Sequence, residues 1–372
     1  MKIKRLIAGM SAKQITGIAV TVLSLLLFFG LTLWADIKVK NLPDQQAASR
    51  WDKEGNAAQV SCFFAENVVV DEFQILNFRQ QFEQQLLEVL PQEETQGGSG
   101  KRLFVDAYSS MGTVTVTSEK GLLENVSAVG IGGDFFLLHP MQLVSGQYFS
   151  GNDLMKDSVI VDEEAAWQLF GSNDIAGKSV MIGDVPHYIA GVVKRPSGKF
   201  AESAGLNKTV VYLSHESLTA YGSGSGISNY EITAPNPVKH FVYTAVKEKL
   251  GVAENDMVVV ENSSRYLPEA LILVLLDFGT RSMQNTAVKF PYWENIGRGW
   301  EDVMALVLLL RFLLLLISVI IIIGYLIYRW RNRKFTGKDI WNFLADRIDA
   351  LQQRLRKRKQ ARLSKQETDE SA

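Results

Sequence analysis

Two short motifs in the chain are similar to sites that bind phosphate or zinc. Residues 177–179 read Gly-Lys-Ser, the end of a phosphate-binding loop, but five residues separate them from Gly171, where such a loop needs four. Residues 215–219 begin with the His-Glu pair of a zinc-protease helix, but Thr219 occupies the place of the second metal-binding histidine. We therefore expect neither nucleotide nor zinc at these positions.

The other residue types that could do chemistry are dispersed along the chain. In the Gly-Ser-Gly-Ser-Gly run at 222–226, Gly224 stands where a hydrolase would place its nucleophilic serine. His139, His187 and His240 lack the spacing of metal ligands, and we expect them to be surface or loop residues. The sequence thus predicts no catalytic residue, no cofactor-binding residue and no metal ligand. We expect that the protein is not an enzyme and needs no cofactor.

The charge distribution divides the chain into three parts. Residues 1–13 carry four basic side chains and no acidic one, residues 36–302 hold 21 Lys and Arg against 34 Asp and Glu, and residues 329–365 hold 13 against three. The two changes of sign coincide with the two longest apolar runs. The acidic middle contains no basic patch with interleaved aromatic residues, so we expect no nucleic-acid partner.

The first apolar run, residues 14–35, contains 22 residues without a charge. As a helix it would be about 33 Å long at ~1.5 Å per residue, enough to cross the hydrocarbon core of a bilayer. Its end, Leu33-Trp34-Ala35, lacks the small-x-small pattern of a signal-peptide cleavage site. We therefore predict transmembrane helix 1 at 14–35 and an anchor that stays uncleaved.

The second apolar run extends from Met304 to Tyr328 and includes one charge, Arg311. Because a mid-bilayer arginine is costly, we expect Arg311 at the outer interface, where its side chain can extend toward water. Phe312 to Tyr328 alone gives 17 uncharged residues, near the lower limit for a span. We predict transmembrane helix 2 at 303–328.

The basic flanks predict the orientation of the chain, because short segments rich in Lys and Arg stay in the cytoplasm. We expect a two-pass protein of the bacterial plasma membrane with both termini cytoplasmic, at 1–13 and 329–372, and an extracytoplasmic domain at 36–302. Cys62 is the single cysteine, so this domain has no intrachain disulfide and must be stabilised by its own core.

The extracytoplasmic domain is predicted to contain two β-α-β units. In the first unit, Asp71 caps a helix that ends before Pro91. In the second unit, Asn236 and Pro237 begin a helix that ends at Gly251. Strands are expected at 60–70, 103–108 and 113–117 in the first unit, and at 229–233 and 257–260 in the second. The two units predict a split β-α-β lobe at about 58–111 and 227–262.

The segment between these units, about 112–226, is predicted to be an inserted β-rich lobe. Its strands are expected at 158–162, 179–182, 187–193 and 209–213, with a short helix at 163–170 and a hinge at 222–226. The predicted fold class is therefore α+β, with a split β-α-β lobe and an inserted β-rich lobe between two transmembrane helices.

Two further segments have open interpretations. Ala270–Leu276 is an apolar run of seven residues, either a core strand or an element that lies on the membrane, and we favour a buried element. In the tail, an apolar stripe at 340–355 precedes four basic residues at 356–359 and predicts a basic amphipathic helix. It could bind anionic lipid or form a coiled coil or partner contact, but positive-inside topology alone is the favoured explanation.

A block of about 60 residues carries a family resemblance. It reads GDFFLLHPMQLVSGQYFSGNDL from 133, VIVDE from 159, WQLFGSNDIAGK from 167 and YIAGVV from 188. This block resembles the MacB-like periplasmic core domain of ABC transporter permeases, in the MacB/FtsX-like superfamily. The residues that carry it, which we interpret as structural rather than ligand-binding, are Asp134, Phe135, Phe136, Gly146, Phe149, Asp153, Phe170, Gly171, Gly177 and Gly191.

The resemblance implies a core domain between the first two transmembrane helices of a non-catalytic permease-like subunit. A cytoplasmic ABC ATPase would drive movement of the outer domain. Full permeases have four transmembrane helices, three of them after the core, whereas this sequence has one there. Such a reduced form would pair with a second permease, form a homo-oligomer or act as an accessory subunit. The alternative is a membrane-tethered scaffold or binding module for envelope proteins, without an ATPase. In both cases the lipid bilayer is a partner.

Overall fold

The computed structural model describes residues 11–90, 102–224, 226–281, 288–332 and 347. It divides into two compact units. Leu31–Arg311 form what we call the sheet unit, and Met1–Gly30 together with Phe312–Ala372 form what we call the helix unit. The amphipathic helix predicted at 340–355 lies outside the described residues.

Two long helices, α2 (Ala12–Lys40) and α12 (Tyr292–Arg331), contain the two apolar runs. Both are long and apolar enough to cross a membrane, and an 18-residue stretch within each has a mean hydropathy of 2.3 in α2 and 3.3 in α12. Only 11% and 6% of these stretches are buried, whereas the core helix of a soluble protein would be mostly buried. Within the helix unit, the Ser24 and Ser318 hydroxyls form a 2.6 Å hydrogen bond, a contact of the kind that joins transmembrane helices.

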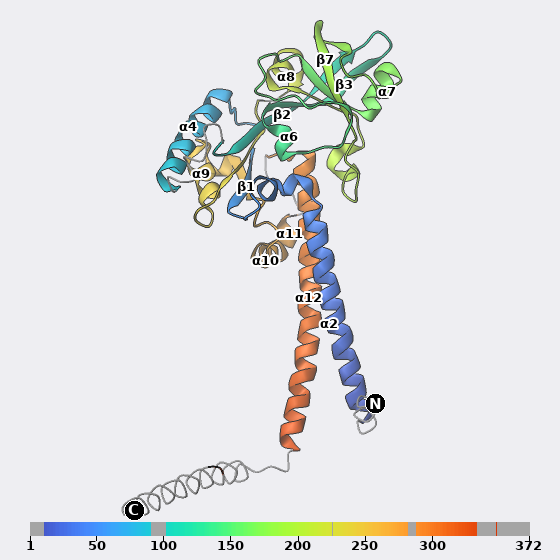
Figure 1. The fold of residues 1–372 in the computed structure, drawn as a ribbon, viewed down its shortest axis with the longest axis vertical. Coiled ribbons are helices and arrows are strands. Elements are labelled where there is room, and N and C mark those ends of the chain that lie inside the picture. The colour runs from blue at the N-terminus through green and yellow to red at the C-terminus, as the bar shows by residue number, and fades with distance from the viewer. Residues whose placement is uncertain (1–10, 91–101, 225, 282–287, 333–346, 348–372) are drawn as a thin grey trace, which may run out of the picture. The chain divides into compact units, whose positions relative to one another are not determined.

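The sheet unit is built on one mixed sheet (Figure 1), whose neighbouring strands follow the order β11-β1-β10-β2-β3-β8-β5-β7-β4. Off this path, β6 pairs with β2 and β7, and β9 pairs with β2. The strands are β1 (Ala57–Phe64), β2 (Val105–Thr117), β3 (Leu122–Gly133), β4 (Leu143–Gly146), β5 (Ser158–Asp162), β6 (Ser179–Ile182), β7 (Val185–Val193), β8 (Val210–Ser214), β9 (Ser223–Gly224), β10 (Asn229–Pro235) and β11 (Met257–Glu261).

One part of the sheet consists of two interleaved β-α-β units. Helix α4 (Glu72–Val89) joins β1 to β2, and helix α9 (Phe241–Lys249) joins β10 to β11. β10 lies between β1 and β2 and is antiparallel to both, and β1 lies in the same way between β10 and β11. The Asp71 side chain accepts a 2.8 Å hydrogen bond from the backbone N–H of Gln74, so it caps α4 as predicted.

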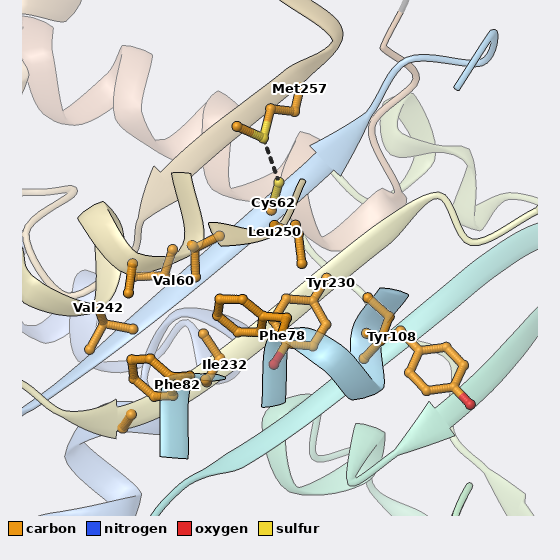
Figure 2. Close-up of a cluster of buried hydrophobic side chains, with 14 of the residues drawn as sticks. Val60, Cys62, Phe78, Phe82, Tyr108, Tyr230, Ile232, Val242, Leu250 and Met257 are labelled. Atoms are coloured by element: carbon orange, nitrogen blue, oxygen red, sulfur yellow. Dashed lines mark hydrogen bonds between the residues drawn. The ribbon is translucent and has the colours of Figure 1, made fainter. Parts of the chain in front are cut away.

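The first hydrophobic cluster fills the space between this part of the sheet and its two helices. Figure 2 shows Phe78 and Phe82 of α4 against Tyr230 and Ile232 of β10. These side chains recur every fourth residue on the helix and every second residue on the strand, so each element buries one face. The Phe78 and Phe82 rings stack 5.6 Å apart, and the Tyr230 ring meets Phe78 edge-on at 5.4 Å.

Two more clusters lie under the rest of the sheet. The second cluster includes Val161, Leu169 and Leu213 and is covered by helices α7 (Glu163–Phe170) and α8 (His215–Tyr221). The third cluster is aromatic and surrounds the short helix α6 (Phe135–Leu138). Its largest fully buried side chain is Trp293 of α12. The molecule therefore has the α+β architecture predicted, with two candidate membrane helices flanking the sheet.

The strands differ from the sequence prediction in several places. β4 was not predicted, and β9 pairs with β2 inside the segment predicted to be a hinge at 222–226. β3 was not predicted, because its sequence includes Asn and several Gly residues that disfavour strands. The two strands predicted at 103–108 and 113–117 form the single strand β2. The run predicted to be a strand at 60–70 ends as β1 at Phe64.

The boundaries of two helices also differ from the prediction. α9 does not begin at Asn236-Pro237, because His240 has a left-handed backbone conformation (φ +65°) that interrupts a helix before Phe241. The run Ala270–Leu276 belongs to helix α10 (Pro268–Leu276) rather than to a core strand. The favoured interpretation, a buried element, is wrong for most of α10, in which only Leu271 and Val274 are buried.

Candidate functional site: a buried ionic network

The most unusual chemical feature of the sheet unit is a buried arginine, Arg265, in the loop after β11. Its guanidinium donates two 2.7 Å hydrogen bonds to the Glu294 carboxylate, and its Nε donates to Glu301. Both glutamates lie on the first turns of α12, and all three side chains are buried. Burial would lower the pKa of Arg265, but the charge and hydrogen bonds of Glu294 raise it above the ordinary value, so the arginine stays charged.

The Arg265 guanidinium also connects α12 with the other long helix and with the sheet. Its Nη1 donates to Gln45 Oε1 at 3.0 Å and to Asn262 Oδ1 at 3.1 Å. Gln45 belongs to the short helix η1 (Pro43–Gln45), which follows the end of α2. Arg265 therefore joins the segments that follow α2 and begin α12 at one point.

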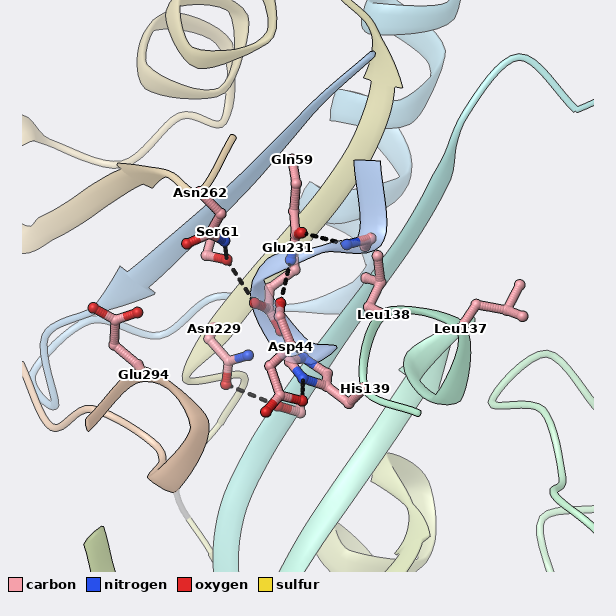
Figure 3. A network of polar contacts seen from close by, with 12 residues as sticks. Asp44, Gln59, Ser61, Leu137, Leu138, His139, Asn229, Glu231, Asn262 and Glu294 are labelled. Atoms are coloured by element: carbon pink, nitrogen blue, oxygen red, sulfur yellow. Dashed lines mark hydrogen bonds and ion pairs between the residues drawn. The ribbon is translucent and has the colours of Figure 1, made fainter. Parts of the chain in front are cut away.

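A hydrogen-bonded chain continues from Asn262 into the middle of the sheet (Figure 3). The Asn262 side chain donates to Ser61 Oγ at 2.7 Å, and Ser61 donates to Glu231 Oε1 at 2.6 Å. Ser61 is on β1 and Glu231 on β10, two adjacent central strands. The loss of one hydrogen bond in this chain would leave a buried polar group unpaired, which is costly, so the chain fixes the positions of its members.

The chain ends at His139, which has no exposed surface. Its Nδ1 lies 2.9 Å from Asp44 Oδ1, and its Nε2 contacts Glu231 Oε2. Each ring nitrogen faces a carboxylate, and only the protonated imidazolium can donate a hydrogen bond from both nitrogens. Burial alone would lower the pKa of His139, but Glu231 and Asp44 outweigh it and raise the pKa to about 9.

The sequence predicts that His139, His187 and His240 are surface or loop residues, and the structure corrects this prediction for two of them. His139 is completely buried, and His187 lies buried on β7, where its Nε2 is 3.2 Å from Ser217 Oγ. His240 is a partly exposed loop residue, as expected. Buried imidazoles persist here because hydrogen-bond partners offset the cost of removing them from water.

The residues that carry the family resemblance lie outside this network and are distributed over several turns. Phe135, Phe136 and Phe149 are buried together in the third cluster, beside His139. Asp134 forms an ion pair with Arg102. Asp153 accepts a 2.9 Å hydrogen bond from the backbone N–H of Ser150 and closes a loop.

The remaining members occupy the second half of the sheet. The φ angle is positive at Gly146, Gly171 and Gly177, a conformation that favours glycine. A Cβ on Gly191 would lie 2.7 Å from the Gln147 carbonyl oxygen. Phe170 packs against the second cluster, with the Lys178 ammonium 5.1 Å from its ring centre.

A cavity of about 570 Å³ lies next to the third cluster. Its lining is largely apolar and includes Trp51, Phe136 and Tyr148, with Arg50 at its edge. Arg50 donates to the carbonyl oxygens of Leu137 and Leu138 at 3.1 and 3.0 Å. The cavity could accommodate an apolar group, and its charged lining residues are Arg50 and Asp134.

The network could not be recognised as a unit in the sequence. Its members lie between Asp44 and Glu301 in the chain and have no regular spacing. One local signal existed: Glu231 lies between Tyr230 and Ile232 on a strand that the sequence predicts. Within the described part of the chain, no group of three or more His, Cys, Asp or Glu side chains is placed to hold a metal ion. The network can therefore connect the ends of the long helices to the sheet through buried charges, and His139 is its titratable group.

The fold and this site define a class, a membrane protein with an α+β domain between two candidate membrane-spanning helices. A family model described as the MacB-like periplasmic core domain matches residues 15–249. The chain therefore belongs to the MacB-like periplasmic core domain family. This membership and the two apolar helices make it a protein of the plasma membrane.

Curated relatives match the chain over short stretches. The Macrolide export ATP-binding/permease protein MacB of Chromobacterium violaceum is 37% identical over 71 residues, which are 18% of this chain and 11% of that protein. The protein of the same name from Agrobacterium fabrum is 31% identical over 96 residues, 25% of this chain and 15% of that protein. The chain thus matches less than a fifth of the length of these relatives.

Two solved structures are also similar. The periplasmic region of MacB from Actinobacillus actinomycetemcomitans has a TM-score of 0.37 and 14% identity, covering 61% of this chain and 93% of that one. The extracellular domain of the noncanonic ABC-type transporter YknZ from Gram-positive bacteria has a TM-score of 0.33 and 16% identity, covering 54% and 99%.

Proposed function

We propose that this protein is a non-catalytic, permease-like subunit of an ABC transporter system, in which a cytoplasmic ATPase moves the extracytoplasmic sheet unit. Its family membership supports the permease-like role. The observation that carries the proposal is the attachment of Arg265 to Glu294 and Glu301 of α12 and to Gln45 beyond α2. A displacement of either helix end would act on this buried ion cluster, and a displacement of α12 would also act on the sheet through Trp293.

The hydrogen-bonded chain gives such a displacement a route into the core. From Arg265 it passes through Asn262 and Ser61 to Glu231, on a central strand. Buried charges and hydrogen bonds have strict geometry, and their loss is costly. The network therefore favours concerted movement of the helix ends and the sheet over independent movement.

The orientation in this proposal follows from charge. The acidic residues 36–302 face outward, and the basic segments 1–13 and 329–372 remain in the cytoplasm. Within the outer domain we propose a split β-α-β lobe (58–111 and 227–262) with the 112–226 lobe inserted. The resemblance residues, such as Gly146 and Phe149, would stabilise that fold rather than bind a ligand.

Affinity purification tests the proposal. The chain would be tagged at its native expression level, extracted in mild detergent and analysed by mass spectrometry, with an unrelated membrane protein of similar abundance as the control bait. We expect enrichment of an ATP-hydrolysing subunit, together with a second permease or a second copy of this chain. Recovery of neither an ATPase nor a permease would contradict the proposal.

Movement can be measured in the recovered complex. Fluorophores on Glu248→Cys of α9 and Arg331→Cys of α12 would report the distance between sheet and helix ends, since both positions are exposed and native Cys62 is buried. We expect ATP to change the energy transfer between the two fluorophores. An unchanged transfer during ATP hydrolysis would contradict the coupling.

The second candidate function, a tethered binding module without an ATPase, is favoured by the cavity of about 570 Å³. Its largely apolar lining would suit an apolar ligand or an apolar protein side chain. The same purification separates the two functions. Enrichment of an envelope protein without an ATPase, lost in a Phe136→Ala variant that still folds, would support this second function.

A further inference from the structure

Helix α10 exposes an apolar surface that the proposed function does not use. Together with the next residues it presents what we call the apolar strip: Leu267, Ile272, Leu273, Leu276 and Phe278. Leu273 is 62% exposed and Leu276 is 76% exposed. Single exposed apolar side chains are common on soluble surfaces, but five exposed apolar side chains within twelve residues indicate a partner.

The opposite face of α10 packs onto the two long helices at the start of their apolar runs. Leu271 and Val274 share a cluster with Ala35 of α2 and with Met304 and Ala305 of α12. Ala35 ends the first uncharged run, and Met304 begins the second. α10 is therefore held at the level where both helices change from polar to apolar sequence.

The surroundings of α10 have the composition of a membrane interface. The rings of Trp34 and Trp300 lie 6.4 Å apart on α2 and α12, and Lys38 lies 5.8 Å from the Trp300 ring. Such aromatic and basic residues are typical of the headgroup region. On α12, Leu306 and Leu309 are exposed in the same unit, so the apolar strip continues an apolar surface already present on the long helix.

On α10 itself the charged residues lie at the two ends, while Leu273 and Val274 also line a hollow with Arg281, Arg298 and Glu301 of neighbouring elements. Glu269 is in the first turn and its carboxylate is 3.4 Å from the Lys239 ammonium, while Asp277 follows the last turn. Between them, residues 270–276 are uncharged. A nine-residue helix with charged ends is too short to cross a bilayer but suits the boundary between headgroups and acyl chains.

We propose that the apolar strip is inserted in the leaflet on the sheet side of the membrane, where acyl chains cover Leu273 and Leu276. The occupant is lipid because the strip is continuous with the lipid-facing surface of α12. A docking site for a soluble protein partner would not need to be continuous with the lipid-facing surface of a membrane helix. α10 would then be a third membrane contact, which fixes the height of the sheet unit above the bilayer.

The proposal can be tested by site-directed spin labelling of the full chain in liposomes of phosphatidylethanolamine and phosphatidylglycerol. Nitroxides would be placed at Leu273→Cys and Leu276→Cys, and at Trp167→Cys of α7 as the matched control. Trp167 is also an exposed apolar residue on a helix, but α7 packs against the second cluster. Buried Cys62 would remain unlabelled.

We expect oxygen, which concentrates in hydrocarbon, to relax the labels at 273 and 276 several-fold more than water-soluble nickel-EDDA, relative to the control at 167. Preferential relaxation by nickel-EDDA would overturn the proposal, because the strip would then face water. Low accessibility to both reagents, or spin–spin broadening removed by dilution with unlabelled chain, would also overturn it in favour of a protein partner. None of these results depends on an ATPase, so failure here is distinguishable from failure of the proposed function.

Discussion

Arg265 neutralises the charges of two buried glutamates, so we expect its substitution to lower the free energy of unfolding strongly. We expect Arg265→Met to lower the free energy of unfolding by about 3–5 kcal/mol, since Glu294 would be left charged in the interior. Thermal and denaturant unfolding of the detergent-solubilised protein would measure this. Lys239→Met is the control, because its exposed pair with Glu269 should contribute no more than ~1 kcal/mol.

A double variant distinguishes the effect of the uncompensated charge from the effect of lost side-chain packing at Arg265. Arg265→Met combined with Glu294→Gln removes the uncompensated charge and should recover part of the lost stability, while Glu301 keeps its ion pair with Arg281. A loss below ~1 kcal/mol in Arg265→Met alone would show that this ion cluster does not stabilise the fold.

The environment of His139 predicts a pH-dependent stability. Its pKa is raised to about 9 in the folded protein by Glu231 and Asp44, against about 6.5 when unfolded. The charged His139 therefore stabilises the folded state by roughly 3 kcal/mol at most. This stabilisation is fully present below about pH 6.5 and is lost as the pH rises through about 9.

Unfolding measured from pH 6 to pH 10 checks this expectation. In His139→Gln the decrease in that range should be much smaller, whereas His240→Gln, at the partly exposed site, should retain it. A wild-type profile that is flat between pH 6.5 and 9 would contradict a charged His139 in the folded state.

At this scale the sequence was least informative. The failed motifs at 177–179 and 215–219 could be dismissed from their spacing alone. The network could not be predicted, because a buried ionic group depends on which distant segments meet. Asp44 and Glu231 are 187 positions apart in the chain, yet the same imidazole contacts both. Nothing local marks His139 as buried.

Among the elements, two glycines with similar backbone angles have different surroundings. Gly146, at the end of β4, has φ +76°, and a Cβ there would lie 2.2 Å from the Ala190 carbonyl oxygen. Gly171, at the end of α7, has φ +69° and open space around it. We expect Gly171→Ala to cost about 1–2 kcal/mol from backbone strain alone.

Gly146→Ala adds a steric clash with β7 and should cost about 1–3 kcal/mol more. The two variants are compared by their free energies of unfolding. Equal losses would mean that β4 shifts away from β7 without penalty, so that the close approach at Gly146 has no role in the sheet.

Elements with strong local signals were predicted well. α4 combines a capping aspartate with apolar residues at helical spacing, and β5 and α7 lie at their predicted boundaries. β3 and α10 were not predicted correctly for opposite reasons. β3 is a strand because it pairs with the long strand β2 on one side and with β8 on the other, despite its glycines. α10 is an apolar run whose seven residues fit a strand as well as a helix.

For the molecule as a whole, the proposed orientation predicts which positions a membrane-impermeant maleimide can reach. In intact spheroplasts we expect labelling of Lys120→Cys, an exposed residue before β3, and no labelling of Arg331→Cys until the membrane is permeabilised. Buried Cys62, whose thiol pKa is raised by burial, provides an unreactive background. Labelling only at 331 would reverse the orientation.

Strand β2 serves both halves of the sheet unit. Tyr108 near its start belongs to the first cluster, whereas Val114 and Val116 near its end belong to the second. If the chain were divided between residues 111 and 112 for separate expression, each fragment would contain part of this strand. Each would then have an unpaired strand edge and exposed apolar side chains. The two halves of the sheet unit are therefore inseparable as expression products and should unfold in one cooperative transition.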